Sequence, residues 1–195
     1  LMPQSFPEQD GIQIAAFSRI AKEGGGDYYD LLDFGEGRFG FVCADIAGKG
    51  VAASLVMVII RSIIRSNAIP GRDASDVVSI VNNTVSSEVG EERFASLYYY
   101  QFDTRFRTIN YCNAGHTPLL LYRADHGSFA RLDTDGMPIG IEEDVEYGQA
   151  SSGLQSGDIA VLFTDGVVEA MNADLEQFGM ERLQQCIREN NVLSA

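Results

Sequence analysis

Three aspartates in this sequence share one setting, in which an apolar or glycine-rich stretch delivers a carboxylate into a turn. They are Asp27 in GGGDYYD, Asp45 in CADIAGKG and Asp165 in LFTDGVVEA. A carboxylate at the end of a buried strand is costly unless it is paired, hydrogen-bonded or bound to a metal, and few basic residues lie next to these three. For any one stretch alone, an aspartate that merely caps a turn is the simpler explanation. The three together favour a metal.

Oxygen donors without paired histidine or cysteine suit Mg²⁺ or Mn²⁺. Two such ions about 3.5–4 Å apart can hold both the attacking and the leaving oxygen of a phosphoryl group. Small residues beside the acids, among them Gly26, Ala47 and Gly166, leave room for backbone carbonyls and water to approach an ion. The residues therefore predict phosphoryl hydrolysis at a centre of two metal ions.

Two other phosphate chemistries are excluded by missing residues. The Gly-Lys pair at 48–49 suggests a nucleotide phosphate loop, but that motif needs a glycine where Cys43 stands and a serine or threonine where Gly50 stands. A cysteine phosphatase needs an arginine six residues after its nucleophile, and neither Cys43 nor Cys112 has one. We expect both cysteines to be core residues.

Length and composition indicate one acidic domain. A chain of 195 residues with 45% hydrophobic content can bury one sizeable core. The formal net charge of −14 argues against nucleic acid or an anionic membrane as partner, because phosphate groups are bound through accumulated Lys and Arg. Three cysteines without paired spacing suit a reducing compartment, with the cytoplasm as the default. The most apolar run, residues 51–60, is too short to span a bilayer.

The elements that must position the aspartates are rich in strands. Residues 12–18 alternate as a strand does, and residues 28–46 form a β-hairpin whose second strand delivers Asp45 at its end. Apolar spacing predicts helices over 51–67, 73–89 and 178–190. Aromatic and β-branched runs predict further strands, at residues 93–103, 108–116, 118–124, 129–133 and 157–166.

Two strand-rich blocks around two helices, without regular β-α alternation, predict an α+β fold with mostly antiparallel sheets. We expect residues 1–11 to be a lead-in from an upstream connector. Residues 12–195 then form a single domain.

Seven stretches, in their order and spacing, resemble the SpoIIE/RsbU-like branch of the metal-dependent protein phosphatases, the type 2C superfamily. They are GGGDYYD, ADIAGKGVAASL, RFASLYY, NAGHTPLLL, GMPIG, GDIAVLFTDGVVEAMN and FGMERL. The resemblance implies two antiparallel sheets packed as a sandwich and flanked by helices. It also implies two Mn²⁺ or Mg²⁺ ions and hydrolysis of phosphoserine or phosphothreonine by a metal-bridging water, without a covalent phosphoenzyme.

The resemblance assigns roles to particular positions. Asp45 would bridge both metals, the backbone carbonyl of Ile46 would ligate one, Asp165 would bind from the facing strand, and Asp27 would act mostly through metal-bound water. Lys22 stands where an arginine of the wider superfamily grips phosphate, and it is either that group or a solvated strand-end charge. His116 stands where the wider superfamily has an acid for a third metal. It either binds metal or phosphate or locks the turn before Pro118.

Relatives continue beyond FGMERL to a strand with an Asp-Asp-x-Thr-like motif, which is absent before Ala195, so we expect a C-terminally incomplete domain that lacks that helix and strand. The alternative to an enzyme is therefore a catalytically weak or inactive phosphatase-like binding or scaffold module. The expected partner is a phosphorylated regulatory protein, of the STAS-type anti-sigma factor antagonist kind, in a bacterial stress-response switch. An upstream sensory or receiver domain and a homodimer are also expected from the resemblance.

Overall fold

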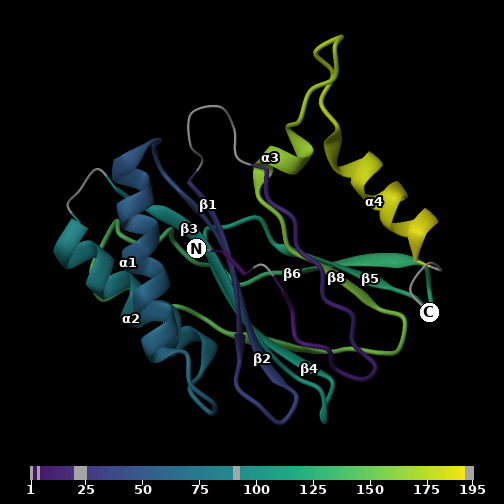
Figure 1. Ribbon diagram of the computed structural model, residues 1–195, viewed down its shortest axis with the longest axis horizontal. Helices are drawn as coiled ribbons and strands as arrows, with labels where there is room; N and C mark the ends of the chain where they lie inside the picture. Colours follow the sequence, from purple (N-terminus) through teal and green to yellow (C-terminus); the bar gives the residue numbers. More distant parts are fainter. Residues whose placement is uncertain (1, 4, 20–25, 90–92, 192–195) are drawn as a thin grey trace.

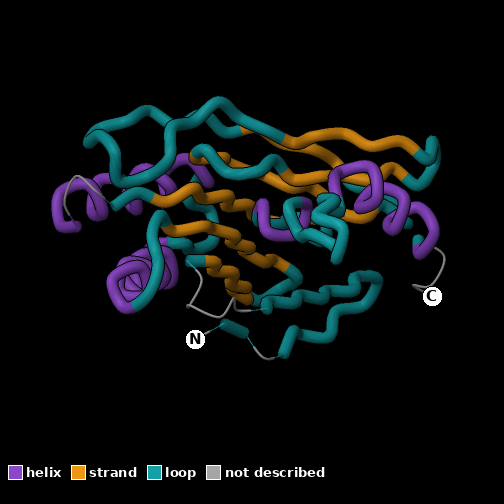
Figure 2. The backbone as a smooth tube through the Cα atoms, turned by 90° about the horizontal axis from the view of Figure 1, so that it is seen from above, coloured by secondary structure: helices purple, strands orange, loops and turns teal. Residues whose placement is uncertain are grey.

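The computed structural model describes residues 2–3, 5–19, 26–89 and 93–191, and it contains two antiparallel sheets (Figure 1). A five-stranded sheet has the order β1-β2-β3-β4-β7, and a three-stranded sheet has the order β6-β5-β8. The strands are β1 (Asp27–Asp33), β2 (Arg38–Ile46), β3 (Ala95–Asp103), β4 (Thr108–Ala114), β5 (Leu119–Arg123), β6 (Ser128–Leu132), β7 (Ala150–Gly153) and β8 (Ile159–Val161). The strands lie in two layers (Figure 2), which confirms the predicted α+β sandwich.

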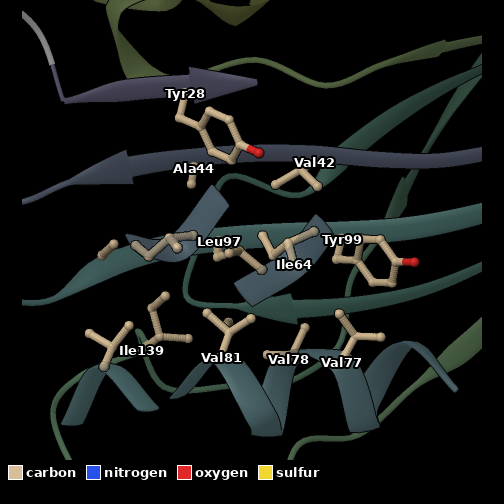
Figure 3. Close-up of a cluster of buried hydrophobic side chains, with 14 of the residues drawn as sticks. Tyr28, Val42, Ala44, Ile64, Val77, Val78, Val81, Leu97, Tyr99 and Ile139 are labelled. Carbon is tan, nitrogen blue, oxygen red and sulfur yellow. The ribbon is translucent and has the colours of Figure 1, made fainter. Parts of the chain in front are cut away.

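Two long helices cover the outer face of the five-stranded sheet. Helix α1 (Val51–Asn67) packs on β1 and β2, and helix α2 (Ala74–Val89) packs on β3 and β4. Both lie within a residue of their predicted bounds. Buried α1 residues recur every fourth position, at Val56, Ile60 and Ile64, which is the spacing of one helical face. They meet sheet residues such as Tyr28, Val42, Leu97 and Tyr99, together with Val77, Val78 and Val81 of α2 (Figure 3).

A second core fills the space between the two sheets. Along β3, Leu97 and Tyr99 face the helices, whereas Tyr98 and Tyr100 face the three-stranded sheet, as the two-residue period of a strand requires. Tyr98 packs with Leu119, Leu121 and Leu132, and its hydroxyl donates a hydrogen bond to the Leu132 carbonyl at 2.9 Å. Strand β3 is therefore buried on both faces, which explains its continuous aromatic run.

Two local predictions were wrong. Residues 12–18 form no strand and make only an isolated bridge between Ile12 and Gln9, because no sheet edge pairs with them and Phe17 is 86% exposed. Tertiary pairing decides such segments, so local alternation is not sufficient. The strand expected over 157–166 is shortened to β8, and Asp165 instead begins the short helix α3 (Asp165–Val168). Helix α4 (Gly179–Asn190) follows as predicted.

No helix in the described part of the chain is long and apolar enough to cross a membrane. Cys43 and Cys112 are buried and unpaired, as expected for core residues, while Cys186 on α4 is exposed. The expected division at residues 11 and 12 stays a prediction.

Candidate active site

Strands β1 and β2 place two of the three predicted aspartates directly opposite each other. Asp27 is the first residue of β1 and pairs in register with Asp45, the penultimate residue of β2. Residues opposite each other in an antiparallel pair have side chains on the same face. Because Ala44 and Ile46 belong to the helix-side core, Asp27 and Asp45 lie on the opposite face, toward the second sheet. Two like charges meet there at the edge of the sandwich.

The third aspartate reaches the same region from the second sheet. The Thr164 hydroxyl, at the position before α3, donates a hydrogen bond to the Asp27 carboxylate at 3.2 Å. Asp165 follows at the start of α3. Burial raises the pKa of the Asp45 carboxyl above its ordinary value, and the negative charges of Asp27 and Asp165 raise it further. Carboxylates distant in sequence, on β1, β2 and α3, therefore lie close enough to repel one another.

The expected backbone ligand lies beside this group. The Ile46 amide donates to the Gly26 carbonyl at 3.2 Å, and a Cβ atom added to Gly26 would collide with the Ile46 carbonyl oxygen. Only glycine permits this approach at residue 26. Gly48 and Gly50 both have positive φ, at 100° and 76°, so the turn after Asp45 requires glycine for its backbone shape. The Gly-Lys pair is therefore part of a turn that separates β2 from α1.

No cation within the described residues compensates these acids. No ion pair among those residues reaches Asp27, Asp45 or Asp165. In the same part of the chain, no three His, Cys, Asp or Glu side chains stand close enough together to hold an ion. The types of ligand atom nevertheless suit a hard divalent cation, which prefers carboxylate and carbonyl oxygens. Three carboxylates and the Ile46 carbonyl lie in this region, and no ion pair among the described residues compensates the negative charge. Lys22, the expected phosphate-binding residue, lies outside the described residues.

His116 also lies near the acids, on a turn that a neighbouring side chain holds. The Asn113 amide group donates to the His116 carbonyl at 2.9 Å, and the Asn113 side-chain oxygen accepts from the His116 amide at 2.8 Å. Asn113 also donates to Asp133 at 2.6 Å. The turn-locking role is therefore carried by Asn113, which sequence reasoning missed although it begins the NAGH motif. The imidazole ring adds one contact in the same turn, with the Thr117 carbonyl oxygen.

The ring of His116 has one nitrogen bonded and one nitrogen without a partner. Nδ1 lies 3.0 Å from the Thr117 carbonyl oxygen, which can only accept, so Nδ1 carries a proton. Nε2 is buried and has no hydrogen-bond partner within the described residues. Burial lowers the pKa of this imidazole below its ordinary value, although the Thr117 carbonyl and the charges of Asp27 and Asp165 act in the opposite direction. The ring therefore lies within electrostatic reach of two of the acids.

Solved structures define the class of this fold. The RsbU and RsbW domains of a Mycobacterium tuberculosis protein superpose with a TM-score of 0.73 at 27% identity, over 86% of this chain and 47% of that one. The SiaA-PP2C domain of Pseudomonas aeruginosa gives a TM-score of 0.71 at 22% identity, over 85% of this chain and 66% of that one. The sandwich is a PP2C-type phosphatase fold.

Sequence comparison gives the family. Residues 35–195 match the SpoIIE family, described as Stage II sporulation protein E. The chain belongs to this family, in the SpoIIE/RsbU-like branch that its motifs predicted. Phosphoserine phosphatase RsbU of Bacillus subtilis (strain 168) is 32% identical over the whole of this chain, which spans 58% of the length of that relative.

Proposed function

We propose that this protein is a metal-dependent phosphoprotein phosphatase that hydrolyses phosphoserine or phosphothreonine on a small regulatory protein. The observation that carries the proposal is the convergence of Asp27, Asp45 and Asp165 without a compensating cation among the described residues. The name of RsbU, a phosphoserine phosphatase, supports the reaction. The pairing of RsbU and RsbW domains in one solved relative supports a substrate of the anti-sigma factor antagonist type.

Asp27, Asp45, Asp165 and the Ile46 carbonyl would hold Mn²⁺ or Mg²⁺. When bound, the ions would supply an acidified water and neutralise charge on the phosphoryl oxygens. The chain itself orients the ligands, since Thr164 donates to Asp27 and the contact with Gly26 fixes the Ile46 carbonyl. A chain with a net charge of −14 repels a phosphate group, so substrate binding at these acids requires the cations.

The test is hydrolysis of an aryl phosphate and of a phosphoserine protein, with Mn²⁺ or Mg²⁺ and then with a chelator. We expect activity only with the metal and a fall of about 100-fold or more for Asp45→Asn, by analogy with the loss of a metal-orienting group. Asp125→Asn is the matched control, because Asp125 forms its ion pair with the exposed His126, outside the site. Activity that survives chelation or the Asp45→Asn change would contradict the proposal.

The scaffold alternative is supported by the finding that no three His, Cys, Asp or Glu side chains in the described residues stand close enough together to hold an ion. It predicts binding of the phosphorylated partner without release of phosphate. Equilibrium binding of the phosphoprotein, measured beside phosphate release on the same sample, separates the two functions. Binding without turnover in the full-length protein would favour the scaffold.

A further inference from the structure

A hairpin of residues 170–178 projects from the body of the molecule directly after α3, the helix that begins with Asp165 (Figure 1). The Phe178 amide closes the base of the hairpin by donating a hydrogen bond to the Ala170 carbonyl at 2.7 Å. Asp165 is one of the three acids of the candidate active site. One short helix therefore joins the hairpin to that site.

The tip of the hairpin has a defined shape, which the side chain of Asn172 holds. Its oxygen accepts hydrogen bonds from the amides of Asp174 and Glu176, both at 2.9 Å. Its NH₂ group donates to the Glu176 carboxylate at 3.1 Å, and the Leu175 amide donates to the Asn172 carbonyl at 3.1 Å. The tip can therefore meet a partner without first being ordered.

Leu175 stands at this tip in a conformation that leucine rarely adopts. Its φ is 62°, in the left-handed region that favours glycine and asparagine, and the residue is 77% exposed. Backbone outliers of this kind cluster at binding and active sites. Val167, Met171 and Met180 are also exposed, so several apolar side chains face solvent on and beside the hairpin.

The hairpin region is acidic as well as apolar, which limits what can bind it. Between residues 165 and 182 the chain has five acidic residues and one basic residue, Arg182, which lies 3.6 Å from Glu176. A second copy of this chain, with the same net charge of −14, is repelled, as is an anionic membrane or a nucleic acid. The complementary partner is a protein whose apolar patch is bordered by lysine or arginine.

We propose that this hairpin docks the phosphorylated protein substrate, with Leu175 packed into an apolar patch of that protein while its phosphoserine lies at the three acids. The inference rests on the proposed function and adds the surface that selects the substrate. A protein whose phosphoserine reaches the acids passes the hairpin, because the hairpin leaves the molecule beside α3 (Figure 1). A small aryl phosphate needs no such contact.

Steady-state kinetics of the full-length protein tests the inference with two substrates, para-nitrophenyl phosphate and a serine-phosphorylated anti-sigma factor antagonist. Leu175→Asn removes the apolar contact and supplies a residue suited to the positive φ. We expect kcat/KM for the phosphoprotein to fall about tenfold or more, mainly through KM, and the value for the aryl phosphate to change less than about twofold. Equal changes for the two substrates, or none for either, would overturn the inference.

Phe106→Asn is the matched control, because Phe106 is also an exposed apolar residue on a turn. That turn follows the end of β3, whereas Asp45 pairs near the start of β3, so Phe106 lies at the other end of the sheet. The control should leave both kinetic values within about twofold of wild type. Thermal unfolding gives a second readout, since Leu175→Asn should unfold at an equal or higher temperature than the wild type. A lower temperature would assign Leu175 a structural role and overturn the inference.

The outcomes separate this inference from the proposed function. If both substrates are hydrolysed and Leu175→Asn changes neither rate, only the docking role fails. If neither is hydrolysed, the phosphatase proposal fails, and calorimetric binding of the phosphoprotein decides the docking role. Binding that Leu175→Asn weakens about tenfold supports that role, and unchanged or absent binding overturns it. Sedimentation that shows a dimer lost in Leu175→Asn would assign the tip to a second copy and overturn it too.

Discussion

Two of the three aspartates on strand β1, Asp27 and Asp30, lie three residues apart and have opposite surroundings. Asp30 is fully buried on the helix side, where the Arg65 guanidinium donates two hydrogen bonds of 2.7 Å and the Tyr28 hydroxyl donates one of 2.9 Å. Asp27 lies on the other face and meets Asp45 across the ladder. An odd separation along a strand puts two side chains on opposite faces, so one stretch, GGGDYYD, supplies both.

The difference indicates how to distinguish a structural acid from a functional one. Asp30 joins β1 to the end of α1 and has its charge balanced within the chain, with Arg61 as a second basic neighbour at 3.7 Å. Asp27 and Asp45 have no such partner in the described residues, and burial, together with the neighbouring charges of Asp27 and Asp165, raises the pKa of Asp45. Balanced acids stabilise the fold, whereas unbalanced acids require a ligand from outside.

The largest expected effect on folding comes from Asp30→Asn. Removing its charge leaves Arg65 facing a buried site without its anion, and we expect a loss of about 3 kcal/mol in the free energy of unfolding. Denaturant unfolding measures it. Asp27→Asn on the same strand is the matched control and should cost no stability in metal-free protein, yet it should weaken Mn²⁺ binding. Equal destabilisation by Asp30→Asn and Asp27→Asn would contradict the distinction between a structural Asp30 and a functional Asp27.

Gly26→Ala tests the backbone part of the site. The added methyl group would collide with the Ile46 carbonyl oxygen, so we expect a cost of about 2 kcal/mol in unfolding free energy and weaker Mn²⁺ binding. Gly148→Ala is the control, because no atom lies within 4 Å of its added Cβ. If Gly26→Ala binds Mn²⁺ as the wild type does, the Ile46 carbonyl is not a ligand.

Asp158 is a second acid whose charge is compensated within the chain, and its contribution to the free energy of unfolding depends on pH. Burial opposes ionisation, but the Gln155 and Ala124 amides and Arg123 hold the pKa of this carboxyl below its ordinary value. The stability that it contributes is present above the unfolded pKa of about 3.9 and is lost as pH falls through the lower folded pKa. We expect Asp158→Asn to cost about 1.5 kcal/mol at pH 7, by loss of charged hydrogen bonds. That difference from wild type should shrink below pH 4; a constant difference would contradict the assignment.

The smallest expected change in the free energy of unfolding comes from Asp45→Asn, and it should be a gain in stability, not a loss. In metal-free protein, Asp45→Asn removes a charge that Asp27 and Asp165 repel, so we expect a gain of up to about 1 kcal/mol at pH 7, limited by solvent screening. Chemical denaturation with a chelator present measures it, and added Mn²⁺ should then stabilise only the wild type. A clear loss of metal-free stability would mean that Asp45 is already balanced.

Hydrophobic period and strand ends are local properties, and they were sufficient to predict the α+β class, both long helices and the three aspartates Asp27, Asp45 and Asp165 at the ends of their stretches. The sandwich of two sheets was predicted only through the family resemblance. The sequence did not indicate that Asp30 pairs with Arg65, since the two lie 35 positions apart and only packing of α1 on β1 joins them. Nor did it show which nitrogen of His116 is free, which depends on the Thr117 carbonyl and on the turn held by Asn113. The strand expected over 12–18 failed because pairing partners are not encoded in a local pattern.

Calorimetric titration of the wild type and of Asp45→Asn with Mn²⁺, at equal pH and low salt, tests the central claim most directly. The unbalanced acids predict saturable binding by the wild type and a loss of affinity of about 100-fold or more in the variant. Absence of saturable binding by the wild type, or equal affinity in the two proteins, would contradict the account.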